Sequence, residues 1–389
     1  MRRKWSEKAI YGIGLMALTA CTSDSELREE AQVPIGLSAY TAQPAPQPRE
    51  GGDDATRADA TLLAEKGIPD GQSIGVYAYY HASSTWEDDY SAGAGTVTPN
   101  FMNNQQATYD ADDDALHYAP VKYWPNTPDD KLSFIAYYPY TDESTAATGI
   151  TPTVGTDGLP QFGFTVNSDV TEQVDFLISE LLKDQTKPTV SDRVHLLFRH
   201  ATAKVTFRIV VNDTLRHDLA TLKVNSLVLS KICTKGVYKA TGPEWTYSTD
   251  ETETDKTDKS DFTVVDNAAE PKVNHLTEPY LMLPQTLTDD VQLSIDYSLT
   301  FRGYDTTYKY DGNDGTTPVE TDTYTYRNSA TLQLNTMKQA GTATAIAQWE
   351  PHHHYVYTIR LGARQIGFTA QVVEWGEEVN SIIDQFETQ

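Results

Sequence analysis

Short segments in which apolar residues alternate with other residues dominate the pattern of this chain. The first is carried by Val33, Ile35, Leu37 and Ala39, and this period of two is that of a strand with one buried face. The same kind of pattern marks eight further segments, at residues 74–80, 132–138, 194–211, 224–229, 291–301, 324–334, 355–361 and 366–373. The pattern therefore predicts a chain built from many short β-strands.

The composition agrees with this pattern. The chain of 389 residues contains 23 tyrosines, and it has few of the long Leu, Ala, Glu and Lys runs that favour helices. The strands do not alternate with helical segments, so a parallel sheet covered by helices is not expected. We predict an all-β fold in which antiparallel sheets pack as sandwiches.

Two stretches with few apolar residues divide the chain. Residues 41–61 are rich in Pro, Ala, Gly and Asp and predict an extended, accessible linker. Residues 182–192 contain the run Lys-Asp-Gln-Thr-Lys-Pro and mark a second break. The predicted parts are a leader at residues 1–20, an N-terminal pro-segment at 21–61, a first domain at 62–190 and a second domain at 191–389.

The leader has the form of an export signal. Arg2, Arg3, Lys4 and Lys8 precede about a dozen mostly apolar residues, too few to span a bilayer as a helix. The run Leu-Thr-Ala-Cys that ends at Cys21 resembles a bacterial lipobox, which implies that the Cys21 thiol is lipidated and the chain is cut just before it. A plain secretory peptide, cut elsewhere nearby, is the alternative.

The net charge of the chain narrows the set of partners. The 55 acidic and 30 basic residues give a formal net charge of -25, and such a surface repels nucleic acid and anionic lipid. Nucleic acid is therefore not an expected partner.

Cys233 has no activating base near it in the sequence, and we expect it to be a small apolar residue within a sheet.

No familiar catalytic pattern is present. The sequence has no Gly-rich phosphate loop, no Gly-x-Ser-x-Gly and no His-Glu-x-x-His, so we expect neither an enzyme nor a cofactor. His352, His353 and His354 are adjacent, and adjacent strand residues point to opposite faces, so at most two could meet at a metal ion. The acidic turns at residues 110–114 and 311–315 lack EF-hand spacing, and solvated turns are expected there instead of metal sites.

The aromatic residues leave a binding function open. Tyr79, Tyr80, Trp86 and Trp245 would stack on sugars if they lined one surface, whereas in a sandwich most such residues belong to the core or its rim.

An ordered set of motifs along the chain carries a resemblance to a known family. After Cys21, the motifs lie at residues 56–58, 70–79, 123–125, 132–140, 174–178, 194–207, 280–285, 355–359 and 366–375. In this order they resemble fimbrillin-type proteins of anaerobic Gram-negative bacteria of gut and mouth. The resemblance implies a shaft or tip subunit of surface fimbriae that supports adhesion and is built from two transthyretin-like β-sandwich domains.

The resemblance also implies a route of assembly. A lipoprotein precursor travels to the outer membrane, where an arginine-specific protease cuts it after a strand near the N-terminus. The loss of that strand opens an apolar groove, which a strand from another fimbrial subunit fills. In this chain Val33, Ile35, Leu37 and Ala39 match the displaced strand. The cut is expected between Arg57 and Ala58, with Arg49 and Glu50 as the alternative.

The C-terminus is expected to supply the donor strand. Its tail carries Val379, Ile382, Ile383 and Phe386, although their three-to-four spacing also fits a short amphipathic helix. The segment at residues 366–372 is more simply a core strand of the second domain. Two alternatives remain to the fimbrial subunit: an unprocessed anchor, and a monomeric outer-membrane lipoprotein that binds a glycan or another host or bacterial surface ligand.

Overall fold

Strands make up most of the structure, a computed structural model that describes 13 ranges of the chain. These are residues 32–41, 68–91, 97–142, 148–189, 193–211, 220–240, 244–247, 259–264, 274–276, 278–304, 320–339, 341–361 and 366–375. Within them the one α-helix is α1 (Trp86–Ser91), and two single-turn 3₁₀ helices lie at Val170–Glu172 and Leu334–Thr336. The expectation of an all-β fold is confirmed.

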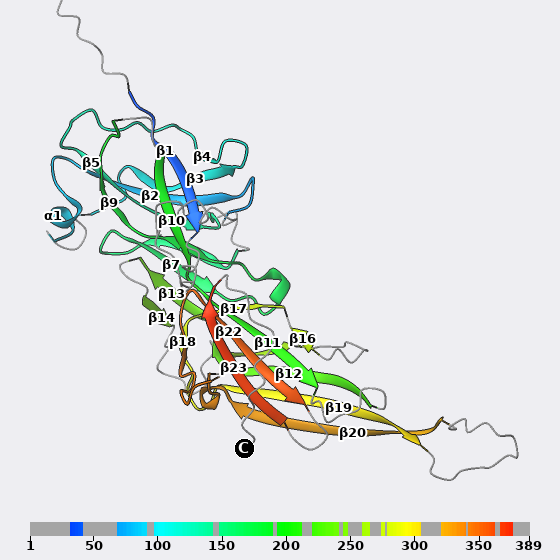
Figure 1. Cartoon of the computed structure of the whole chain (residues 1–389). Coiled ribbons are helices and arrows are strands. Elements are labelled where there is room, and N and C mark those ends of the chain that lie inside the picture. Colours follow the sequence, from blue (N-terminus) through cyan, green and yellow to red (C-terminus); the bar gives the residue numbers. More distant parts are fainter. Residues whose placement is uncertain are drawn as a thin grey trace, which may run out of the picture.

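The first half of the molecule is built on an eight-stranded sheet. Its strands pair in the order β2 (Ser73–His81), β3 (Met102–Asp110), β4 (Ala115–His117), β1 (Gly36–Thr41), β10 (Arg193–His200), β8 (Leu177–Ser179), β5 (Lys131–Tyr138) and β9 (Leu182–Gln185). Because β2 also pairs with β5, the path of hydrogen-bonded strands closes into a ring (Figure 1). Strand β1 is one member of this ring.

The interior of the ring is apolar because inward positions alternate along each strand. Val76 of β2, Phe134 of β5, and Leu196 and Phe198 of β10 are fully buried, together with Leu37 of β1. All five belong to one hydrophobic cluster.

Two further sheets form the second half. One consists of β16 (Asn274–Leu276), β11 (Ala203–Val211), β22 (His353–Leu361) and β23 (Ile366–Glu374), with β17 (Tyr280–Met282) also paired to β11. The other consists of β15 (Lys259–Val264), β12 (Ala220–Cys233), β19 (Gln292–Tyr304) and β20 (Glu320–Gln333). Residues of both sheets, such as Phe207 of β11 and Ile295 of β19, share one buried cluster. Strands β18 (Gln285–Thr286) and β21 (Gln348–Trp349) form a small additional pair.

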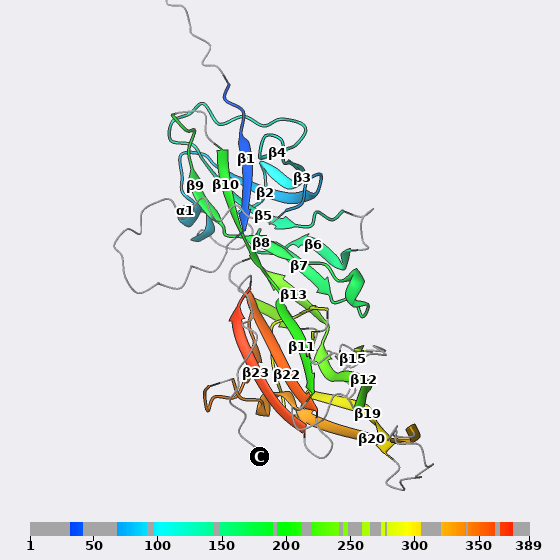
Figure 2. The ribbon, with the colours of Figure 1, turned by 45° about the vertical axis from the view of Figure 1, so that its right-hand side comes forward.

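A fourth sheet joins the halves. It pairs β14 (Glu244–Tyr247), β13 (Lys235–Lys239), β7 (Pro160–Thr165) and β6 (Ile150–Val154) in that order. Strand β7 precedes β10 in the chain, whereas β13 follows β12, so the sheet contains strands from both halves (Figure 2). Phe176, Tyr238 and Trp245 pack together at this junction, and the buried cluster continues through it.

The structure refines the expectation for one strand segment. The segment at residues 194–211 forms two strands, because the chain leaves the first sheet after His200 and enters another at Ala203. The predicted division between residues 190 and 191 precedes β10, which pairs with β1 and β8 of the first sheet.

The expectation of antiparallel sheets throughout is wrong for two pairs. Strand β1 is parallel to β10, and β11 is parallel to β22. Parallel neighbours require a long connection, and in both pairs the partners lie more than 100 residues apart in the chain, so local alternation could not reveal their direction.

Candidate functional site

Strand β1 lies between two strands that are distant from it in the sequence. It pairs along its whole length with β10, from Gly36 beside Arg193 to Thr41 beside Phe198. On its other side Leu37 pairs with Leu116 of β4. Figure 2 shows β1 between these two neighbours. Removing β1 would therefore leave unpaired backbone groups on both sides of one slot.

The residues before β1 are also held by the backbone. Pro34 bridges to Tyr123, the Ile35 N–H donates to the Lys122 carbonyl at 2.9 Å, and the Trp124 N–H donates to the Val33 carbonyl at 2.9 Å. These bonds extend the pairing of β1 toward the end of the first half that lies farthest from the second half.

A side chain reinforces this pairing. The Tyr118 hydroxyl donates to the Ile35 carbonyl at 2.7 Å. Burial raises the pKa of Tyr118 to about 12, so its hydroxyl keeps its proton and remains a donor at neutral pH.

One face of β1 points into the ring. Ile35 and Leu37 are 3% and 1% exposed, and the half-buried Val33 and Ala39 pack against the same cluster. Their neighbours in register on β10 are the buried Val194 and Leu196. The four positions predicted to share an apolar face therefore do so.

The other face of β1 carries a small polar contact. Ser38 Oγ lies 2.8 Å from His195 Nδ1, and the Tyr40 ring packs 5.4 Å from the ring of His195. A Cβ atom at Gly36 would lie 2.9 Å from Arg193 Cγ, and Arg193 itself donates to the carbonyls of the β3–β4 turn. This face therefore favours small residues at positions 36 and 38.

The other residues predicted to take part in processing and donation lie outside the described ranges. They are Cys21, Arg49, Glu50, Arg57, Ala58, Val379, Ile382, Ile383 and Phe386. Sequence reasoning missed the partners of the first strand, because no local pattern marks Tyr118, Lys122, Trp124, Arg193 and His195 as its neighbours. Trp124 and His195 lie in the motifs at residues 123–125 and 194–207, but a motif does not say which strands pair.

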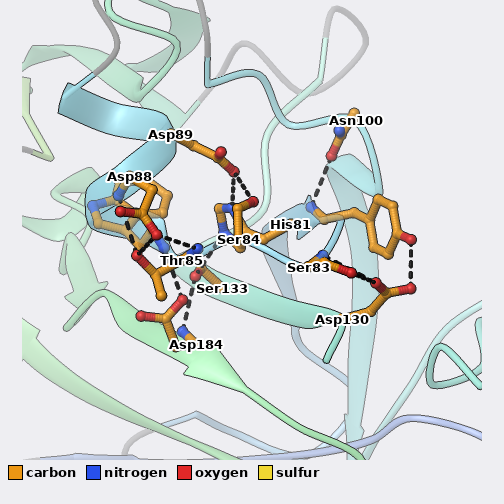
Figure 3. Close-up of polar contacts among 12 residues, drawn as sticks. His81, Ser83, Ser84, Thr85, Asp88, Asp89, Asn100, Asp130, Ser133 and Asp184 are labelled. Atoms are coloured by element: carbon orange, nitrogen blue, oxygen red, sulfur yellow. Dashed lines mark hydrogen bonds and ion pairs between the residues drawn. The ribbon is translucent and has the colours of Figure 1, made fainter. Parts of the chain in front are cut away.

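A second site has the outline of a catalytic triad (Figure 3). His81 Nδ1 lies 2.5 Å from Asp89 Oδ2, and His81 Nε2 lies 3.0 Å from Ser133 Oγ. The Asp184 N–H also donates to Ser133 Oγ at 3.1 Å. Ser133 and His81 are 0% and 1% exposed, so no substrate reaches the serine oxygen in this conformation.

The physical role of this network is to hold α1 against the sheet. Asp89 belongs to α1, while His81 ends β2 and Ser133 lies in β5. Asp184 of β9 accepts from the Trp86 N–H at 2.8 Å. Nearby, Asp130 accepts from the Tyr80 hydroxyl at 2.6 Å, and this hydrogen bond lowers the pKa of the Asp130 carboxyl (Figure 3).

The aromatic residues considered for sugar stacking are mostly covered. Tyr79 and Trp86 are 1% and 2% exposed, Trp245 packs against the core, and its Nε1–H donates to the Ala201 carbonyl at 2.9 Å. Their assignment to the core and its rim is confirmed for these three residues.

The histidine run divides between two environments. His354 is buried, with Nε2 at 2.7 Å from Thr206 Oγ1, whereas His352 and His353 both approach Glu374. Burial, followed by the charges of Lys204 and Arg208, lowers the pKa of His354 to about 4. The imidazole of His354 is thus neutral at physiological pH.

One exposed group in the described residues brings together donors that a cation could use. The donor atoms of Asp110, Asp113 and His117 lie within 4.8 Å of one another on the β3–β4 hairpin. All three residues are exposed, and Asp113 already contacts His117 at 3.1 Å. The geometry is that of a solvated acidic turn with one histidine contact.

Comparison with known proteins identifies the family. The model of the fimbrillin-like family matches residues 56–375. The chain belongs to the fimbrillin-like family. This fimbrillin-like chain is 25% identical to fimbrium subunit Fim1C of Phocaeicola vulgatus, over 95% of its own length and 96% of that protein.

A solved structure agrees on the fold. A crystal structure of a fimbrial protein from Bacteroides vulgatus matches with a TM-score of 0.60 and 19% identity, over 88% of this chain and 99% of that one. Among the described residues of the fimbrillin-like chain, no helix has the length and apolar character needed to cross a membrane.

Proposed function

We propose that this chain is a structural subunit of cell-surface fimbriae, in the shaft or at the tip, that assembles by exchanging β1 for a strand of another subunit and supports adhesion. The observation that carries the proposal is the position of β1. It completes a closed ring between β10 and β4, yet it lies at the N-terminal end of the chain, directly before the linker that contains Arg49 and Arg57.

Strand exchange is favoured by the free energy gained when a new strand refills the slot left by β1. Burial of Ile35 and Leu37 contributes about 1.5–3 kcal/mol each, and backbone groups of β10 and β4 would lose their partners together with them. An added strand restores both the hydrogen bonds and the apolar contacts. All hydrogen bonds between the inserted strand and its neighbours β10 and β4 must break before the strand can leave, so the exchanged product dissociates slowly.

In this proposal the precursor is delivered as a lipoprotein anchored in the outer membrane through Cys21. Cleavage between Arg57 and Ala58, or between Arg49 and Glu50, separates the anchored segment and β1 from the two domains, which we propose are transthyretin-like sandwiches. The tail with Val379, Ile382, Ile383 and Phe386 is the proposed donor of this subunit to its neighbour.

The N-terminal residue of the protein on the cell tests the proposal. We expect it to be Ala58, and we expect R57A to leave an acylated start at Cys21 and to stop assembly. R57K is the matched control, because it keeps the positive charge and a trypsin site but removes the arginine. If trypsin restores oligomers to R57K but not to R57A, both in a background of R49A and K66Q that removes the other trypsin sites between β1 and β2, the cut at this position is what permits assembly. Normal fimbriae that contain an intact residue 21–57 segment in every copy would contradict the proposal.

A further inference from the structure

We infer that the groove left by β1 and the C-terminal tail of this chain do not fit one another, so that the strand replacing β1 comes from a different type of subunit. This inference rests on the proposed strand exchange and adds the kind of partner that the groove accepts. The partner offers an extended strand with uninterrupted apolar or small side chains on one face.

The inward face of β1 sets the first requirement. Its inward positions are Val33, Ile35, Leu37, Ala39 and Thr41, of which Ile35, Leu37 and Thr41 are 3%, 1% and 8% exposed. The first four belong to or pack against the cluster inside the ring, and Leu37 and Ala39 lie beside the inward Val194 and Leu196 of β10. A charged group at one of the central positions would be buried without a partner, which is strongly unfavourable.

The outward face sets a second requirement. Ser38 is 2% exposed and lies against His195, while a Cβ atom at Gly36 would lie 2.9 Å from Arg193 Cγ. Two hydrogen bonds from Arg193 to the carbonyls of Asp113 and Asp114 limit its freedom to move aside. The incoming strand therefore needs small residues at these two outward positions.

The tail of this chain fails one of the two requirements in either strand register. Its apolar residues have helical spacing, and a strand sends alternate residues to opposite faces. One face would consist of Val379, Ser381, Ile383, Gln385 and Glu387, and the other of Glu378, Asn380, Ile382, Asp384 and Phe386.

Neither direction of insertion changes this result. Any placement that puts Ile382 and Phe386 into the ring also puts Asp384 between them. If Val379 and Ile383 point inward instead, the two outward positions that need small residues receive two neighbours from the series Glu378, Asn380, Ile382, Asp384 and Phe386, none of which is small. The residues of β1 show no such interruption. A second copy of this chain is therefore a poor donor to this groove.

Peptide binding to the processed protein tests this inference. Chain cut at Arg57 would be incubated with labelled peptides of residues 32–42, of the tail at 376–389, and of the tail with D384V. We expect the first peptide to bind at least tenfold more tightly than the natural tail, and D384V to recover most of the difference. The tail with E387V is the matched control, because it removes one negative charge and introduces the same residue on the opposite face, and it should not improve binding.

The outcomes separate this inference from the proposed function. A natural tail that binds within twofold of the peptide of residues 32–42 would overturn the inference and leave strand exchange intact. Equal gains from D384V and E387V would also overturn it, because charge alone would then explain the effect. If no peptide binds, including residues 32–42, strand exchange itself fails, and the inference fails with it.

Discussion

Single side chains in β1 determine how firmly the first strand is held. Leu37 is 1% exposed and lies in the ring beside Val194 of β10. Its contacts exist only while β1 is in place, whereas those of Leu196, which is 0% exposed, belong to a strand that remains. Substitutions at these two positions therefore distinguish interactions of the precursor from those of the processed protein.

We expect L37A to lower the free energy of unfolding of the precursor by about 2–5 kcal/mol, because it leaves a cavity in a packed core. After processing and strand exchange the effect should vanish, since residue 37 is no longer part of the folded unit. L196A is the control and should destabilise both forms. Urea unfolding of the precursor and of purified oligomers measures the difference, and an equal loss for L37A in both forms would contradict the account.

His354 makes stability depend on pH. Its pKa is about 4 in the folded protein, against about 6.5 when the chain is unfolded. Between these values the unfolded chain binds more protons, so stability is lost as pH falls from about 6.5 to about 4, by up to about 3 kcal/mol. H354Q should flatten this part of a curve of unfolding free energy against pH. Equal slopes for wild type and H354Q would refute the assignment.

At the scale of elements, local patterns predicted where strands lie better than they predicted which strands pair. The alternation at Val33, Ile35, Leu37 and Ala39 correctly indicated one apolar face, because burial on one side is written into adjacent residues. The parallel pairing with β10 was not predictable, since it joins residues 157 apart, as in the contact between Ser38 and His195.

The dependence of strand pairing on distant residues also explains other differences between the predicted and the observed strands. Residues 194–211 look continuous in apolar pattern, but the chain changes sheets between His200 and Ala203. Strand β3 has few apolar residues, and Met102 and Ala107 are its only buried residues. Its role as a ring member comes from pairing with β2 and β4, which no local period reveals.

A disulfide between β1 and β10 should block exchange. Ser38 and His195 are register partners with side chains in contact, so S38C with H195C, in a C233A background, places two thiols side by side. We expect the oxidised protein on the cell to be cut at Arg57 but to stay out of fimbriae, and reduction to restore its incorporation. Each single cysteine variant serves as a control. Incorporation of the oxidised double variant into fimbriae at the wild-type rate would contradict strand exchange.

At the scale of the whole molecule, the two halves share a core. Phe176 contacts Phe164 at 5.5 Å between ring centres, and Tyr238 and Trp245 of the second half at 5.9 and 6.1 Å. The sheet that pairs β7 with β13 crosses the same junction. Load applied along a fimbria would therefore pass through a packed, hydrogen-bonded connection instead of a bare linker.

We expect F176A to lower the free energy of unfolding by about 3–5 kcal/mol and to reduce protection from hydrogen exchange in both β7 and β13. F134A is the comparison, because Phe134 belongs to the separate cluster inside the ring, and its effect should concentrate in β2, β5 and β10. If F176A left the protection of β13 unchanged, the two halves would not be coupled through this junction.

The most direct test of the central claim is to identify what lies beside β10 in assembled fimbriae. A photoreactive amino acid in place of His195, which faces Ser38 across the ladder, would be cross-linked in the precursor and in fimbriae, and the joined peptides read by mass spectrometry. The account predicts a cross-link to residues 36–40 of the same chain in the precursor and to a peptide from another subunit in the fimbriae. A cross-link to residues 36–40 of the same chain in both would contradict it.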